Sequence, residues 1–163
     1  MALDSDTLQQ LLDTLTRFVN ERLRPLESKT AADDRIPQEV VEEMKALGLF
    51  GLTIPEAYGG LGLNMQEEAA VARVFGRTSP AFRSAFGTNV GIGSQSLVID
   101  GTEDQKQFYL PKMATGEIVG SFCLSEPEAG SDAASVRTTA VKDGDDYLIN
   151  GTKRYITNAP WAD

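Results

Sequence analysis

Up to Gly116, hydrophobic positions recur along the chain at steps of three and four residues. This spacing gathers apolar side chains on one face of an α-helix, so it predicts a set of amphipathic helices packed together. The first is capped by one of the polar residues 4–6 and ends before Pro25, and the last ends near Pro111. Helices are expected over residues 8–23, 37–47, 65–77, 80–100 and from 103 onward.

Capping signals agree with this periodicity. Asn64 with Glu67, and Thr102 with Gln105, have the spacing of a capping box, in which two side chains satisfy free backbone N–H groups at a helix start. Gly48 follows the second helix, where a glycine can take the left-handed conformation that ends a helix. The glycines between residues 87 and 93 lower helix stability, and they indicate either close packing against another element or a kinked core helix.

Past Gly116 the hydrophobic period changes to two, and the residues become those that suit strands. Residues 118–124 form a continuous apolar run, residues 136–142 alternate, and residues 147–157 continue the pattern. Turn signals lie at Asp143-Gly144 and Asn150-Gly151, so the pattern predicts an antiparallel β-meander.

The predicted fold class is therefore α+β, with an all-helical N-terminal domain followed by an incomplete antiparallel β-barrel or sandwich. The domains are expected at residues 1–117 and 118–163. Three or four strands leave at least one unpaired edge, which needs a partner. We therefore expect this chain to be a fragment of a longer protein.

Charge and composition exclude several classes of function. The net charge of -9 repels phosphate backbones and anionic lipid heads, so neither nucleic acid nor a membrane is an expected partner. The chain has no histidine, which removes Ser/His/Asp catalysis and imidazole-ligated metals. The single cysteine, Cys123, is expected to be a buried strand thiol in a reducing compartment. No signal peptide or membrane span is visible, which favours a cytoplasmic protein.

One segment stands out as a candidate binding site, FCLSEPEAGSD at residues 122–132. A chain that turns at Pro127 and has no side chain at Gly130 can direct backbone N–H groups at a ligand. The hydroxyls of Ser125 and Ser131 can join them, facing an anion or a heteroaromatic edge. The spacing also fits a plain strand connection stabilised by local side-chain turns, and from the residues alone this alternative stays open.

This segment resembles the flavin-binding signature of the acyl-CoA dehydrogenase family, with Ser125 where threonine is also common. Three other motifs resemble the family in the same order, and the match spans nearly the whole chain. Tyr155 stands where tryptophan is usual, so aromatic character is kept. The three motifs are PEAYGG at 55–60, GTEDQK at 101–106 with YLP at 109–111, and NGTKRYITN at 150–158.

The resemblance implies FAD as the cofactor. Backbone groups of residues 122–125 and the Ser125 hydroxyl would bond the flavin ring, and Ser131 would meet the FAD pyrophosphate or the pantetheine of the substrate. Tyr155 would pack beside the flavin, and the Thr157 hydroxyl would point toward flavin N5. Tyr155 could equally be a core aromatic. The candidate cofactor-binding residues are Phe122, Cys123, Leu124, Ser125, Gly130, Ser131, Tyr155, Ile156 and Thr157, with Ser131 also a candidate for the substrate.

The family's reaction removes a proton from the carbon beside a thioester carbonyl and transfers hydride from the next carbon to the flavin. In the family a glutamate of the C-terminal helical domain is the base, so no catalytic residue is expected here and the chain alone should be inactive. Glu126 is interpreted as a turn residue and Glu128 as a solvated one. The family's acyl pocket is lined by the region corresponding to residues 82–97.

The resemblance further implies an acyl-CoA substrate from fatty acid β-oxidation, an electron-transfer flavoprotein as electron acceptor and a homo-oligomer, either dimer or tetramer. Two alternatives remain. A flavoprotein oxidase or monooxygenase could use the same scaffold, because flavin contacts do not decide how the reduced flavin is reoxidised. A short, non-catalytic binding module derived from the scaffold is the other.

Overall fold

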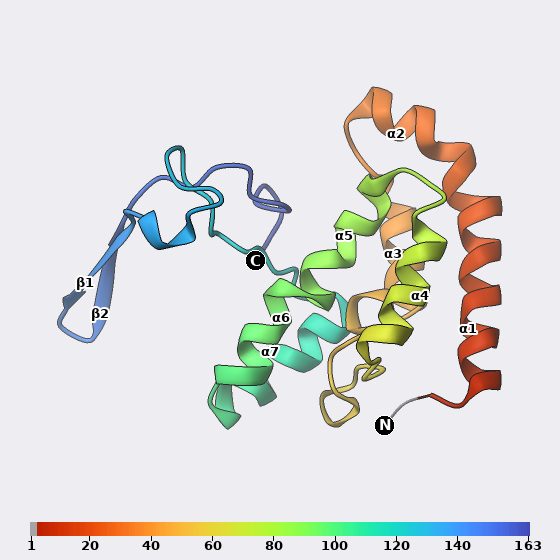
Figure 1. Cartoon of the computed structure of the whole chain (residues 1–163), viewed down its shortest axis with the longest axis horizontal. Coiled ribbons are helices and arrows are strands. Elements are labelled where there is room, and N and C mark those ends of the chain that lie inside the picture. The colour runs from red at the N-terminus through yellow and green to blue at the C-terminus, as the bar shows by residue number, and fades with distance from the viewer. Residues whose placement is uncertain (1–2) are drawn as a thin grey trace.

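The computed structural model describes residues 3–163, in which helices form one body and two strands lie on an extension that projects from it (Figure 1). Residues 121–157, called the arm below, make up this extension. The predicted α+β class is confirmed. The helices are α1 (Ser5–Phe18), α2 (Glu27–Asp33), α3 (Gln38–Ala46), α4 (Met65–Phe75), α5 (Pro80–Val90), α6 (Ile92–Asp100) and α7 (Glu103–Thr115).

The predicted helix ends are the actual ones at several positions. Asp4 caps α1 by accepting hydrogen bonds from two backbone N–H groups, and Asn64 and Thr102 each form a complete capping box. Gly48 follows α3 with φ 72°, and Gly116 follows α7 with φ 74°. Local side-chain chemistry therefore defines where these helices begin and end.

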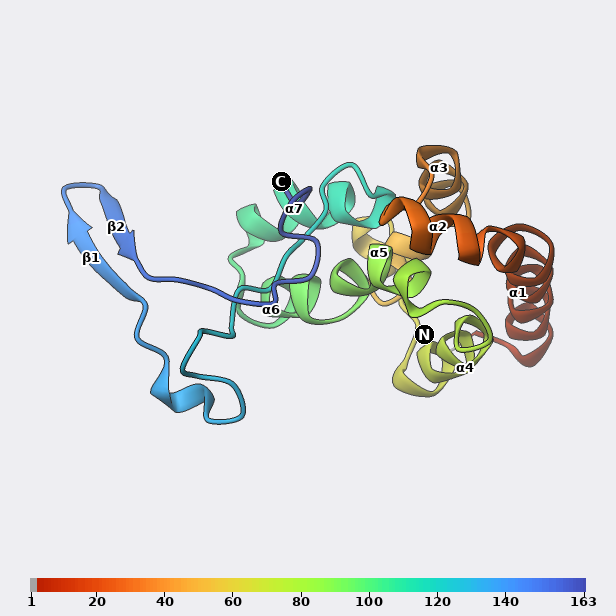
Figure 2. The ribbon, with the colours of Figure 1, turned by 90° about the horizontal axis from the view of Figure 1, so that it is seen from above.

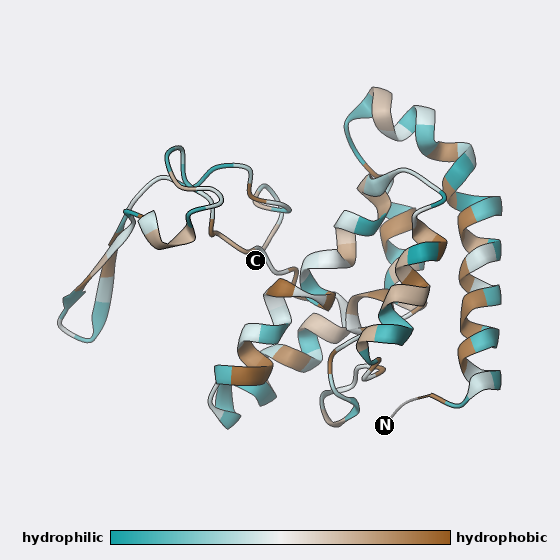
Figure 3. Ribbon diagram, in the orientation of Figure 1, coloured by the Kyte–Doolittle hydropathy of each residue, from teal (hydrophilic) through white to brown (hydrophobic). Residues whose placement is uncertain are grey.

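The core lies between α1, α3, α4 and α5. Phe86 is its centre, because its ring contacts Phe75 edge to face with 5.0 Å between centroids and Phe50 at 6.3 Å. Apolar and polar bands alternate along α1, which turns its apolar face to this core (Figure 3). The largest buried side chains are Phe50, Phe75, Phe82, Phe86, Leu15, Leu23, Met44, Leu49, Leu52, Ile54, Leu110 and Val19.

Two helical details differ from the sequence prediction. The expected helix over residues 80–100 breaks at Gly91, whose φ and ψ are both -109°, so α5 and α6 are separate. The helix α2 was not predicted, because only Thr30 is buried in it and it has no apolar stripe. A tertiary contact holds its start instead: the Glu27 carboxylate accepts hydrogen bonds from the Thr78 hydroxyl (2.7 Å) and the Ser79 N–H (3.1 Å).

The strand prediction was wrong in extent. The structure has one antiparallel hairpin, β1 (Thr139–Asp143) with β2 (Asp146–Asn150), in which Thr139 pairs with Asn150. Residues 118–124 and 151–157 were expected to be strands and are not. Both strands of the hairpin are exposed on both faces, at the far end of the arm (Figure 2). No third strand or second layer within residues 3–163 covers them, so the ladder stops after five pairs.

The second predicted turn was also wrong. Asn150-Gly151 is not a hairpin turn, since β2 ends at Asn150 and the chain continues extended. Gly151 lies against Thr138, and a Cβ at this position would come within 2.7 Å of the Thr138 Cβ. The glycine therefore permits a close backbone approach at the base of the hairpin. Within residues 3–163, no helix has the length and apolar character needed to cross a lipid bilayer.

Candidate functional site

The motifs at 122–132 and 150–158 meet in the arm. Residues 121–126 lie beside residues 153–157, and the two segments run in opposite directions (Figure 2). The Arg154 N–H donates to the Ser125 carbonyl at 2.9 Å, and the Ser121 hydroxyl donates to the Thr157 carbonyl at 2.8 Å. The Lys153 ammonium donates to the Leu124 carbonyl at 3.2 Å. The fold therefore brings together two segments that are about 30 residues apart in the sequence.

The predicted site residues are mostly exposed. Phe122 and Leu124 are 40% and 39% exposed, and the Tyr155 ring is 81% exposed. Gly130 and Ser131 follow the turn that starts at Glu126, and they make no hydrogen bond to residues 153–157 in the described part of the chain. The structure thus joins Ser125 to the Tyr155–Thr157 segment and leaves Gly130 and Ser131 at the edge.

The expectation for Cys123 was wrong, because its thiol is exposed and unpaired. The apolar flanks suggested a buried strand, but within residues 3–163 the segment 118–124 joins no sheet and this side chain stays exposed. An apolar sequence run becomes buried only where a second layer packs on it.

Tyr155 has φ 57°, a left-handed conformation that is uncommon for a bulky side chain. The Arg154 guanidinium lies over its ring at 4.5 Å, a cation–π contact. Residues 151–157, which the pattern predicts to be a strand, form none, so Tyr155 and Thr157 do not share a strand face. Residues held in such conformations are concentrated at functional sites, where other contacts fix them.

Glu126 is the most strongly bound side chain of the site. Its Oε2 accepts a hydrogen bond from Arg137 N–H at 2.7 Å. Its Oε1 accepts from Thr138 N–H at 2.9 Å, the Thr138 hydroxyl at 2.5 Å and the Lys153 ammonium at 2.9 Å. These donors, the Thr138 hydroxyl foremost and Arg137 N–H next, lower the pKa of the Glu126 carboxyl from its ordinary 4.5 to about 2.

Glu126 also closes the predicted turn, since its backbone N–H and carbonyl both pair with Ala129. Glu128, expected to be solvated, is 66% exposed and forms a surface ion pair with Arg137. The sequence identified Glu126 as a turn residue but gave no signal that its carboxylate binds Lys153, because that contact spans 27 residues.

Two asparagines that sequence reasoning missed attach the arm to the helices. Asn89 on α5 is fully buried, and its amide donates to the carbonyls of Met113 (3.0 Å) and Ile118 (2.7 Å) and accepts from Gly120 N–H (2.7 Å). Asn158 is the last residue of the motif at 150–158, and its amide donates to the Thr88 hydroxyl at 2.8 Å. An asparagine inside an apolar helix is the one signal that could have indicated Asn89.

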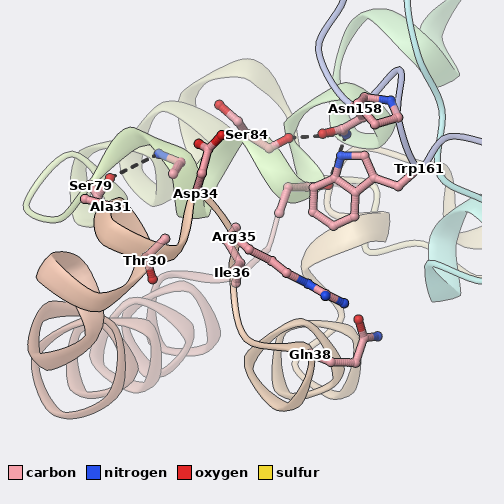
Figure 4. A pocket seen from close by; sticks show the side chains of 13 residues that line it. Thr30, Ala31, Asp34, Arg35, Ile36, Gln38, Ser79, Ser84, Asn158 and Trp161 are labelled. Carbon is pink, nitrogen blue, oxygen red and sulfur yellow. Dashed lines mark hydrogen bonds between the residues drawn. The ribbon is translucent and has the colours of Figure 1, made fainter.

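A pocket of about 540 Å³ opens beside Asn158, between the loop that joins α2 to α3 and the start of α5. Arg35 lies on one side of it and Trp161 on the other, with Ser84 on α5 behind (Figure 4). Because Asn158 is next to Thr157 in the chain, this pocket adjoins the candidate site.

Comparisons with known proteins agree with the motifs. The family profile described as "Acyl-CoA dehydrogenase, N-terminal domain" matches residues 5–117, and the one described as "Acyl-CoA dehydrogenase, middle domain" matches residues 121–163. The (2S)-methylsuccinyl-CoA dehydrogenase of Cereibacter sphaeroides is 39% identical over 94% of this chain and 28% of its own length.

Solved structures give the same result. An acyl-CoA dehydrogenase of Bacillus anthracis, complexed with FAD, matches 98% of this chain and 28% of its own with a TM-score of 0.87 and 37% identity. A structure described as the electron transferring flavoprotein of Acidaminococcus fermentans matches 100% of this chain and 43% of its own, with a TM-score of 0.89 and 33% identity. The chain thus spans less than half the length of these relatives. Its two profile matches together cover nearly every residue, and the chain belongs to the acyl-CoA dehydrogenase family.

Proposed function

We propose that the protein of which this chain forms part is an FAD-dependent acyl-CoA dehydrogenase, which introduces a double bond between the α and β carbons of an acyl-CoA thioester. The observation that carries this proposal is the pairing of the Ser125 segment with the Tyr155–Thr157 segment, through Arg154 N–H and the Ser121 hydroxyl. Both halves of the flavin motif are then available to one ligand.

The residues present fit a flavin. The hydroxyls of Ser125 and Thr157 make no hydrogen bond within residues 3–163, so both are free to meet polar atoms of a ligand. The exposed faces of Phe122, Leu124 and Tyr155 suit a planar heteroaromatic ring, which would cover them.

We assign roles on this basis. Ser125 would bond the flavin ring with its hydroxyl, Thr157 would point its hydroxyl toward N5, and Tyr155 would pack beside the ring. Ser131, at the exposed edge, would meet the pyrophosphate of FAD or the pantetheine of the substrate. When bound, FAD supplies the acceptor for hydride from the β carbon.

The chain provides no assigned base for the α proton. Glu126, which lies within the motif, is held in its ionised form by four donors that lower its pKa to about 2, so it is a weak base. We propose that the base belongs to the part of the family's fold that lies beyond the span of this chain.

The acyl chain has a candidate place in the pocket beside Asn158. This pocket shares Ser84 and Ala85 with the region 82–97, which the family resemblance assigns to acyl binding. Its position next to Thr157 would let the reacting carbons face the flavin while the tail enters the pocket.

We further propose a domain division between residues 117 and 118, supported by profile matches to 5–117 and 121–163. An electron-transfer flavoprotein is the proposed electron acceptor, on the similarity to the Acidaminococcus fermentans structure. A homo-oligomer is proposed on the family resemblance alone.

The test is anaerobic addition of acyl-CoA thioesters of increasing chain length to the protein that contains this chain, loaded with FAD. The visible absorption band of the flavin should bleach with saturated thioesters. Thr157→Val should slow this bleaching and shift the flavin absorption maximum, since one hydrogen bond to the ring, about 1 kcal/mol, is lost. Thr152→Val, an exposed threonine of the same segment, is the control. If no thioester bleaches the wild-type flavin, the proposed function is wrong.

A further inference from the structure

Glu126 is the point at which three segments of the arm meet. Its backbone closes the turn 126–129, and its carboxylate accepts the N–H groups of Arg137 and Thr138, just before β1 begins. The same carboxylate accepts a hydrogen bond from the Lys153 ammonium, on the opposite segment, at 2.9 Å.

Lys153 extends this connection to the flavin motif. Its ammonium donates a second hydrogen bond to the Leu124 carbonyl at 3.2 Å, and the next residue, Arg154, donates its N–H to the Ser125 carbonyl at 2.9 Å. The Glu126–Lys153 pair therefore stands directly beside the contact that joins Ser125 to the Tyr155–Thr157 segment.

This pair is not an ordinary surface ion pair. The side chains of Glu126 and Lys153 are 6% and 24% exposed, whereas those of Glu128 and Arg137 are 66% and 77% exposed. A shielded pair with additional hydrogen bonds is held in one geometry, while an exposed pair is loosened by solvent and salt.

We propose that Glu126 is the positioning residue of the flavin site: through Lys153 and the N–H groups of Arg137 and Thr138, it sets the spacing between Ser125 and the Tyr155–Thr157 segment. Its carboxylate acts through these groups and does not itself touch the cofactor. The inference rests on the proposed function, since it concerns the site assigned there to FAD.

The experiment compares Glu126→Gln with Glu128→Gln in the FAD-loaded protein. Glu126→Gln keeps the shape of the side chain, but its amide nitrogen, a donor, must face either Arg137 N–H or the three donors of Thr138 and Lys153. We expect it to weaken FAD binding roughly tenfold or more and to shift the reduction potential of the flavin that remains bound. Glu128→Gln should change neither quantity.

The reduction potential separates positioning from stability. A variant that is merely destabilised binds less FAD, but its bound flavin keeps the wild-type potential and absorption maximum. Glu126→Gln with wild-type potential would therefore overturn the inference, as would an equal effect of Glu128→Gln. Lys153→Met should reproduce the shift in potential, and Lys153→Arg should restore it in part.

Amide hydrogen exchange in the FAD-free protein tests the positioning role of Glu126 separately from the proposed function. In the protein without FAD, Glu126→Gln should speed exchange at the amides of Arg137, Thr138 and Arg154, because the contacts that order these segments are lost. Unchanged exchange would contradict the positioning role. If the wild-type protein binds no FAD, the proposed function fails, and exchange at these amides still decides whether Glu126 orders the arm.

Discussion

Buried polar side chains hold the arm in place through hydrogen bonds to backbone groups. Asn89 is 0% exposed and satisfies the carbonyls of Met113 and Ile118 and the N–H of Gly120. Glu126 does the same for the N–H groups of Arg137 and Thr138. Removing Asn89 leaves buried or half-buried backbone groups without this partner, and removing Glu126 does the same to two partly buried N–H groups, which costs more than the loss of one contact.

The charge on Glu126 gives a prediction at the residue scale. Its folded-state pKa of about 2 lies below the ordinary 4.5, so its stabilising contribution is present above pH 4.5 and is lost as the pH falls toward 2. In an NMR titration, the amide signals of Arg137 and Thr138 should move with a midpoint near 2. Glu126→Gln should abolish this titration. A midpoint at 4.5 would mean that the hydrogen bonds do not form in solution.

At the scale of elements, local backbone conformation determines where a helix ends. The side chains packed against that end determine whether a substitution there is tolerated. Gly48 and Gly116 both end helices at positive φ. Within residues 3–163 and apart from its chain neighbours, a Cβ at Gly48 would meet no atom within 4 Å, but one at Gly116 would lie 2.9 Å from Cγ of Phe50 and 3.0 Å from Cγ of Lys45. The two glycines thus carry the same conformational requirement in different surroundings.

This difference predicts two unequal effects. Gly48→Ala should lower the free energy of unfolding by about 1–2 kcal/mol, the cost of a left-handed conformation for alanine. Gly116→Ala should cost about 1–3 kcal/mol more, because Phe50 in the core must move. Urea unfolding of both variants measures the difference. Equal losses would show that the space around Gly116 relaxes freely.

At the scale of the whole molecule, the helical body and the arm are joined at a few points. Asn89 binds the segment that leaves α7, and Asn158 binds α5 where the arm returns. Near these points Val119 and Asp163 exchange hydrogen bonds, with Val119 N–H donating to the Asp163 carboxylate at 2.9 Å. The base of the arm is therefore fixed on both sides, while the β1–β2 hairpin projects from it (Figure 1).

Release of one attachment should loosen the arm. Asn158→Gly removes the hydrogen bond to Thr88. Glycine adopts the φ of 65° found at this position without strain, so the variant tests the loss of the side chain alone. We expect trypsin to cleave after Lys153 or Arg154 roughly tenfold faster, which corresponds to about 1.4 kcal/mol of local stability. Asn150→Gly, at the exposed end of β2, should leave this rate unchanged.

The sequence by itself determined the features that depend on neighbouring residues. Hydrophobic periodicity identified the α+β class, the capping boxes at Asn64 and Thr102 located two helix starts, and Gly48 located a helix end. The motifs at residues 122–132 and 150–158 identified the family. These signals act within a few residues, so they can be read along the chain.

Only the tertiary structure decided what depends on distant residues. The helix α2 forms beside Ser79, which Glu27 reaches across the fold, and residues 118–124 remain outside any strand because no neighbouring strand pairs with them within residues 3–163. The Glu126–Lys153 contact spans 27 residues, and the contact between Asn158 and Thr88 spans 70. Burial, ladder pairing and the ionisation of Glu126 depend on which segments meet in space, and short-range sequence patterns do not carry that information.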